Sequence, residues 1–116
     1  MGDERFLAVY RIRRPADFRR AYQRRCSAGD DLLLVFGYPN GLPFARLGLS
    51  VSRKVGGAVV RNRWKRLVRE AFRLSRPQLP AGIDLIVVPR PETEPALATL
   101  VESLSRLACR LAGKLQ

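Results

Sequence analysis

The chain has 116 residues, 47% of them hydrophobic, which suffices for one ordinary domain with a core and excludes a disordered tail. Its formal net charge is +12 and it contains no histidine. The charge indicates a polyanionic partner, and the missing histidine excludes histidine acid–base chemistry and histidine metal sites. Residues 5–25 carry a net charge of +7 and residues 53–76 carry +8. Two such segments favour a binding surface over a merely solvated cationic face.

The remaining bulk properties indicate a soluble cytoplasmic protein. Cys26 and Cys109 have no metal or redox spacing, and we expect both to be reduced. No apolar run approaches transmembrane length, and residues 1–14 lack the apolar core of a signal peptide. Without an internal repeat or a linker, residues 1–116 are predicted to form one domain.

The N-terminal quarter predicts an extended segment followed by a helix. Residues 1–14 mix basic and apolar residues and are expected to be partly extended. Pro15 suits the first turn of a helix running to about Arg25. Phe18 and Tyr22 are four residues apart and therefore share one face. Residues 28–31 are expected to form the turn that closes this helix.

Two strands are predicted next. Residues 32–36 form an apolar run, residues 37–41 predict a hairpin-type turn, and residues 44–52 predict a second strand. In the second strand Leu47, Leu49 and Val51 point to one side. The other side is small and polar, either because something approaches its backbone closely or because it faces solvent.

Residues 58–74 predict an amphipathic helix, stopped by Pro77. Its apolar residues fall on one side at helical spacing: Val60, Trp64, Leu67, Val68, Ala71 and Phe72. Its polar and basic residues gather opposite: Asn62, Lys65, Arg66, Arg69, Arg73 and Arg76. We expect Trp64 to lie in the core, so that one face is buried and the other presents a cationic row.

The C-terminal third predicts the central strand and a last helix. Residues 83–88 are almost wholly apolar, interrupted by Asp84. A helix is expected to open at Thr93 or Glu94, with Pro95 in its first turn and an apolar stripe from Leu97 to Leu111. The order helix, strand, strand, helix, strand, helix predicts an α+β fold built as an α-β sandwich.

The residues offer no credible catalytic or metal site. The adjacent acids Asp30 and Asp31 are predicted to serve a turn, and Glu70 is predicted to orient neighbouring arginines. A nucleic-acid site is better supported, because arginines bind phosphates and aromatic rings stack on unpaired bases. Phe18 and Tyr22 are candidates for stacking on a single strand, with a core position as the alternative for either.

Residues 48–73 closely resemble the signature of the bacterial ribonuclease P protein component. The most specific part is Arg61-Asn62-Arg63-x-Lys65-Arg66-x-x-Arg69-Glu70. The segments Asp17-Phe18-x-x-x-Tyr22 and 83–88 also match in kind and position.

The resemblance implies a ribosomal-protein-like fold with a left-handed βαβ crossover, a handedness against the usual rule. It also implies an accessory subunit without a bound cofactor or a required protein partner. In that family a catalytic RNA uses Mg²⁺ to remove the 5′ leader from precursor tRNA. The protein supports this RNA and binds the single-stranded leader in a cleft between the first helix and the sheet.

Carried over to this sequence, the resemblance assigns residues to two surfaces. The predicted RNA-binding residues of the signature helix are Arg61, Asn62, Arg63, Lys65, Arg66, Arg69 and Arg73. The predicted leader cleft contains Phe18, Tyr22, Ser50, Arg53 and Lys54, and Val35 occupies the strand position that often supplies a cleft aromatic. Two alternatives remain: a structural, ribosomal-type RNA-binding protein, and a free protein nuclease, which the missing acid–base set disfavours.

Overall fold

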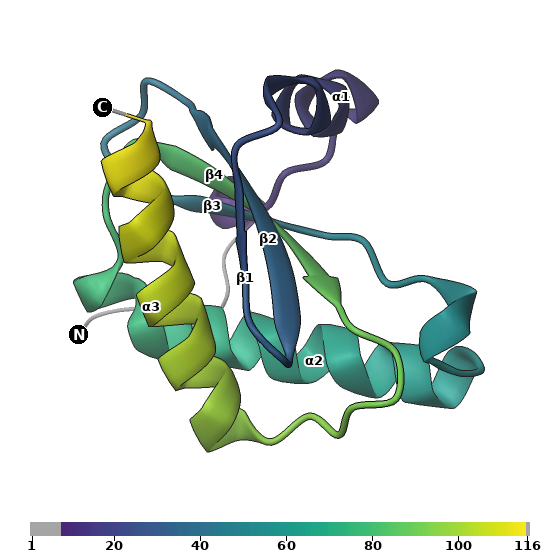
Figure 1. Ribbon diagram of the computed structural model, residues 1–116. Coiled ribbons are helices and arrows are strands. Elements are labelled where there is room, and N and C mark those ends of the chain that lie inside the picture. The colour runs from purple at the N-terminus through teal and green to yellow at the C-terminus, as the bar shows by residue number, and fades with distance from the viewer. Residues whose placement is uncertain (1–7, 116) are drawn as a thin grey trace.

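A computed structural model describes residues 8–115. Three α-helices and a four-stranded sheet form the fold (Figure 1). The helices are α1 (Pro15–Arg24), α2 (Ala58–Ser75) and α3 (Leu97–Lys114), and the strands are β1 (Ser27–Gly29), β2 (Leu33–Pro39), β3 (Arg46–Leu49) and β4 (Ile83–Pro89). Short 3-10 helices span Ala8–Tyr10, Arg53–Val55 and Arg76–Gln78. The predicted α+β class is confirmed.

The strand order is β1-β2-β4-β3, so the most apolar strand, β4, is central, as predicted. It pairs antiparallel with β2, Val35 opposite Val87, and parallel with β3, Leu47 opposite Leu85. The parallel pair is joined through α2, which is the βαβ connection that the resemblance implies.

Helices cover both faces of the sheet. α2 and α3 pack together on one face, where Trp64, Phe72 and Leu104 join the inward residues of β2, β3 and β4 in the main core. α1 packs on the other face, where Ile12, Ala21 and Ile86 form a second, smaller core. Trp64 is fully buried, which confirms its predicted core position.

The predicted hairpin between β2 and β3 is wrong. β2 continues to Pro39, and residues 40–45 then carry the chain past β4, which lies between the two strands. The run Ile83–Pro89 is buried at nearly every position, and only a central strand buries both of its faces. Burial of the apolar β4 between β2 and β3 therefore decides the strand order, although residues 37–41 have the composition of a hairpin turn.

Two predicted boundaries and the predicted burial of Val60 also differ. Residues 27–29 form β1 on the edge of β2, and the turn begins only at Asp30. α3 starts at Leu97, because Glu92 adopts a left-handed conformation (φ 65°) and Thr93 donates to the Arg90 carbonyl. Val60 is 42% exposed, since the first turn of α2 extends beyond the sheet (Figure 1).

Asp30 joins the β1–β2 turn to α3. One carboxylate oxygen accepts from the backbone N–H groups of Leu32 and Leu33, each at 2.9 Å. The other accepts from Ser103 Oγ at 2.7 Å and from Arg106 at 2.8 Å. The predicted turn role is confirmed. Burial alone would raise the pKa of Asp30, but these hydrogen bonds together hold it below its ordinary value.

We expect Asp30→Ala to lower the free energy of unfolding by about 2 kcal/mol at neutral pH, because it removes four hydrogen bonds. The folded-state pKa is the lower one. The stabilisation is therefore complete above the ordinary aspartate pKa and is lost as the pH falls through the folded value. Urea titrations at a series of pH values should show the difference from the wild type shrinking in acid.

Asp31→Ala is the matched control, since Asp31 is exposed and makes no ion pair or hydrogen bond with a described residue. A difference between Asp30→Ala and the wild type that stays constant down to acid pH would contradict the role given to the carboxylate.

Candidate nucleic-acid interface

An ion-pair network holds α1 against the sheet. Asp84 of β4 is 2% exposed, and its two oxygens accept from Arg46 Nε and Nη2 of β3 at 2.8 and 2.7 Å. Asn40 Nδ2 donates to the same carboxylate at 2.9 Å. Arg46 also lies 3.6 Å from Asp17 of α1. The hydrogen bond to Asp84 raises the pKa of Arg46.

Gly48 lets α1 approach β3. A Cβ atom on residue 48 would lie 3.0 Å from Phe18 Cζ and 3.3 Å from Ile12 Cβ. The small face predicted for this strand is therefore a seat for the Phe18 ring and not a plain solvent face. Phe18 itself is half-buried, part of the smaller core and also part of a cavity wall.

The aromatic side chain of β2 on the α1 face is Phe36, so the position predicted for a cleft aromatic, Val35, lies on the wrong face of the sheet. Val35 is fully buried in the main core, on the face covered by α2 and α3. Because side chains alternate along a strand, Phe36 points to the α1 face. Its ring meets Tyr22 edge-on, with centroids 4.9 Å apart. Tyr22 and Phe36 therefore extend an aromatic surface from α1 onto the sheet.

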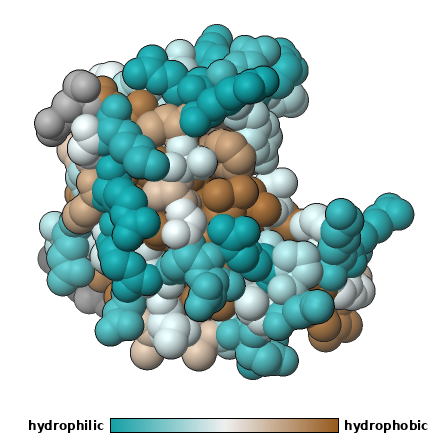
Figure 2. Space-filling view, viewed as in Figure 1, coloured by the Kyte–Doolittle hydropathy of each residue, from teal (hydrophilic) through white to brown (hydrophobic). Residues whose placement is uncertain are grey.

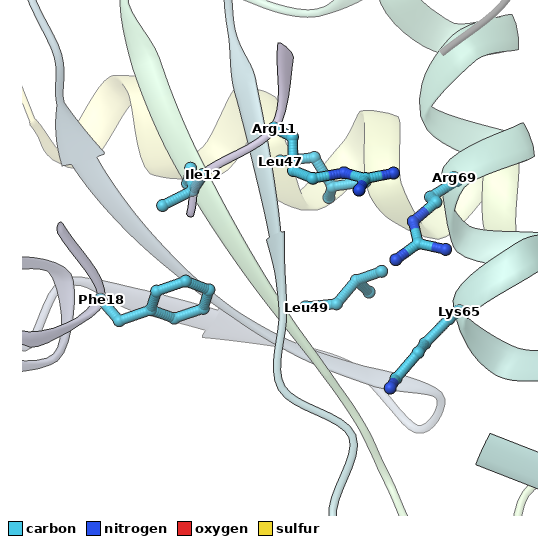
Figure 3. A pocket seen from close by; sticks show the side chains of 7 residues that line it. All are labelled: Arg11, Ile12, Phe18, Leu47, Leu49, Lys65 and Arg69. Atoms are coloured by element: carbon cyan, nitrogen blue, oxygen red, sulfur yellow. The ribbon is translucent and has the colours of Figure 1, made fainter. Parts of the chain in front are cut away.

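A cavity of about 140 Å³ lies between α1, β3 and α2. We call it the Phe18 cavity, and its walls are Arg11, Ile12, Phe18, Leu47, Leu49, Lys65 and Arg69. Figure 3 shows Phe18 entering from α1, with Lys65 and Arg69 reaching across from α2 and leucines of β3 between them. In Figure 2 apolar side chains occupy the hollow beneath α1, with hydrophilic residues around it. One wall is thus apolar and aromatic, and the other is cationic.

The cationic wall brings like charges together. Arg11, Lys65 and Arg69 all line the cavity, and no acidic residue does. Burial, with a further contribution from the charge of Arg11, lowers the pKa of Arg69. An anion placed among these groups would relieve their repulsion, and the flat apolar wall suits a base.

Arg11 reaches this wall through an edge contact that sequence reasoning missed. It forms an isolated parallel bridge with Leu47, and the N–H of Ile12 donates to the Leu47 carbonyl at 2.9 Å. The predicted extended character is confirmed at Arg11, whereas residues 8–10 form a 3-10 helix and residues 1–7 lie outside the described part. The high charge of residues 5–25 was the available signal.

The other predicted residues of α2 distribute over its outer surface. Arg61 is half-buried, whereas Asn62, Arg63 and Arg66 are exposed. Within residues 8–115, five basic residues of this helix have no acidic partner: Arg61, Arg63, Lys65, Arg66 and Arg69. Arg73 differs, because its Nε donates to Glu70 at 3.1 Å and the two form an ion pair. The predicted role of Glu70 is confirmed for Arg73.

The remaining predicted cleft residues follow β3. Ser50 is half-buried and its N–H donates to the Val87 carbonyl at 3.0 Å. Arg53 and Lys54 are exposed on a 3-10 turn capped by Ser52 Oγ, which accepts from the N–H of Lys54. None of Ser50, Arg53 and Lys54 lines the Phe18 cavity. Their assignment to the leader cleft stays a prediction.

Comparisons with known proteins decide the family. A family model described as Ribonuclease P matches residues 6–112. The chain belongs to the bacterial ribonuclease P protein family. A ribonuclease P protein component from Clostridium kluyveri is 46% identical, over 72% of this chain and 77% of its own length. The one from Desulfovibrio desulfuricans is 44% identical, covering 89% and 86%.

A solved structure agrees with this assignment. The ribonuclease P protein of Thermotoga maritima superposes with a TM-score of 0.79 at 34% identity, covering 86% of this chain and 96% of that one. In this ribonuclease P protein, no helix of the described part is long and apolar enough to cross a membrane. No group of three or more acidic or cysteine side chains among the described residues is placed to hold a metal ion.

We expect Gly48→Ala in this ribonuclease P protein to displace the Phe18 ring by a few tenths of an ångström and to lower stability by about 1 kcal/mol. The ring resonances of Phe18 in NMR spectra, together with thermal unfolding, would measure both effects. Gly57→Ala is the control, since a Cβ there meets no heavy atom within 4 Å. Phe18 resonances unchanged by Gly48→Ala would contradict the seating of the ring on β3.

Proposed function

We propose that this ribonuclease P protein binds the single-stranded 5′ leader of precursor tRNA along the α1 face of the sheet. The observation that carries the proposal is the cavity in which Phe18 faces Lys65 and Arg69. A nucleotide needs a flat apolar surface for its base and cations for its phosphate, and this cavity supplies both. Tyr22 and Phe36 continue the aromatic surface beyond it.

The outer surface of α2 serves the catalytic RNA in this proposal. Arg63 and Arg66 are exposed and have no acidic partner among residues 8–115, so their charges are available to phosphates. Asn62 lies with them on the exposed surface. A rigid helix anchored by Trp64 and Phe72 presents these groups at fixed spacing. A folded RNA can therefore be recognised by its shape and backbone.

The chemistry of leader removal is assigned to the RNA subunit. The residues around the cavity are cationic or apolar, and none is a histidine or a carboxylic acid. Mg²⁺ belongs to the RNA in this proposal, and the protein carries no cofactor of its own. The protein contributes substrate affinity and supports the catalytic RNA.

Reconstitution tests the proposal directly. The purified chain is combined with a bacterial ribonuclease P RNA at low Mg²⁺, and cleavage of precursor tRNA at the mature 5′ end is measured. We expect faster cleavage than with the RNA alone and a preference for precursor over mature tRNA. A purely structural RNA-binding protein would bind both tRNA complexes equally, and no gain in cleavage would reject the proposal.

We expect the double variant Lys65→Ala/Arg69→Ala to weaken holoenzyme binding of precursor tRNA more than of mature tRNA. The slope of log affinity against log salt should become less steep by about 1.4, because a contact to a single strand contributes about 0.7. Fluorescence titrations at several salt concentrations would give both quantities.

Two comparison variants make this measurement specific. Arg110→Ala on α3 removes an exposed charge away from the cavity and should change neither tRNA affinity. Arg66→Ala should weaken assembly with the catalytic RNA and leave the preference for precursor intact. Equal losses for mature and precursor tRNA in Lys65→Ala/Arg69→Ala would move those two residues from the leader to the catalytic RNA.

A further inference from the structure

A second cavity, of about 390 Å³, opens at the start of α1. We call it the arginine cavity, and its walls are Arg11, Arg13, Arg14, Asp17, Asn40, Leu42 and Arg46. Four of these seven residues are arginines and one is acidic. No family motif quoted above includes Arg13, Arg14 or Asn40. These three residues belong to none of the sites assigned so far, although Arg11 is shared with the Phe18 cavity.

Hydrogen bonds and ion pairs within the protein fix the walls of this cavity. Asn40 Nδ2 donates to Asp84 at 2.9 Å, and Asn40 Oδ1 accepts from the N–H of Leu42 at 2.8 Å, so the loop after β2 is fixed to the sheet. Arg46 is held by Asp84, and Asp17 also pairs with Arg20. The fixed loop and the start of α1 form the walls.

The charge of Arg13 and Arg14 is uncompensated. Both side chains are exposed, and neither forms a hydrogen bond or an ion pair with another residue in the range 8–115. The single carboxylate of the cavity, Asp17, is already paired with Arg20 and lies near Arg46. Guanidinium groups bind phosphate oxygens through paired N–H donors, so phosphate is the ligand chemistry that fits.

Arg11 lines both this cavity and the Phe18 cavity. The two are therefore adjacent along the edge of β3, where Arg11 pairs with Leu47. A single strand that leaves the Phe18 cavity past Arg11 enters the arginine cavity. The arginine cavity has no aromatic wall, so it suits backbone phosphates and offers no surface for base stacking.

We propose that the arginine cavity binds backbone phosphates of the 5′ leader, one step farther along the strand than the Phe18 cavity. This inference rests on the proposed leader-binding function. It adds a contact that is independent of base identity. The first cavity then holds a base and its phosphate, and the second holds the chain that continues from it.

The test uses the reconstituted holoenzyme with Arg13→Ala/Arg14→Ala and precursor tRNAs whose leaders grow by one nucleotide at a time. Short leaders should bind the variant and the wild type equally. Leaders long enough to reach the cavity should bind the variant about 3- to 10-fold more weakly, with a salt slope less steep by about 1.4. Changing the base sequence of the leader should not alter this loss.

Matched variants and a modified substrate sharpen the test. Arg24→Ala/Arg110→Ala removes two exposed charges outside both cavities and should leave the length dependence unchanged. A neutral methylphosphonate at the leader position where the loss begins should weaken wild-type binding and have little further effect in Arg13→Ala/Arg14→Ala. Additive effects of the two changes would overturn the proposal.

Two other outcomes would overturn it as well. If the variant loses the same affinity for every leader length, and for mature tRNA, then Arg13 and Arg14 contact an RNA segment other than the leader. If Arg13→Ala/Arg14→Ala binds precursor tRNA with long leaders as tightly as the control Arg24→Ala/Arg110→Ala does, then the arginine cavity does not bind the leader. If wild-type binding itself shows no dependence on the leader, the proposed function fails first, and the two failures are thereby distinguished.

Discussion

The Asp84–Arg46 ion pair fixes the arginine that reaches Asp17 of α1, and the candidate site depends on the position of that helix. A carboxylate 2% exposed in the central strand costs several kcal/mol in lost hydration unless it is paired and hydrogen-bonded. Two Arg46 nitrogens and Asn40 supply those bonds. An apolar residue would satisfy β4 as well, but it would not hold Arg46 next to Asp17 of α1. Asp84, the polar residue within β4, therefore contributes more to the position of α1 than to the stability of the fold.

The position of α1 beside β3 also explains how two segments that are distant in the sequence form one surface. α1 carries Phe18 and α2 carries Lys65 and Arg69, and the helices contact different parts of the sheet. β3 lies between them and holds both, through Gly48 beneath Phe18 and through Leu47 in the main core. Lys65 and Arg69 have no acidic partner in the described part, and burial together with the nearby charge of Arg11 lowers the pKa of Arg69. Under the proposed function a leader phosphate would offset this concentration of positive charge, so leader binding should also stabilise the folded protein.

Local periodicity predicted the elements well, whereas pairing and register needed the whole chain. The spacing of Trp64, Val68 and Phe72 is enough to place a buried helix face, because burial repeats every turn. The position of β4 between β2 and β3 could not be read from the turn residues 37–41, which also occur in a hairpin. Val35 and Phe36 are adjacent in β2, and adjacent side chains of a strand point to opposite faces of the sheet. A prediction that is wrong by one residue therefore places Val35 on the α1 face when it lies in the main core.

Arg11 shows why part of the site escapes local patterns. No periodicity singles it out, since it is one of eight basic residues between positions 5 and 25. Its role comes from pairing with Leu47, a contact across 36 positions of the sequence, on the exposed edge of β3. An edge strand has free N–H and C=O groups, and covering them protects the sheet from wrong partners. The residue that covers this edge is placed between the Phe18 cavity and the arginine cavity, and it presents one positive charge to both.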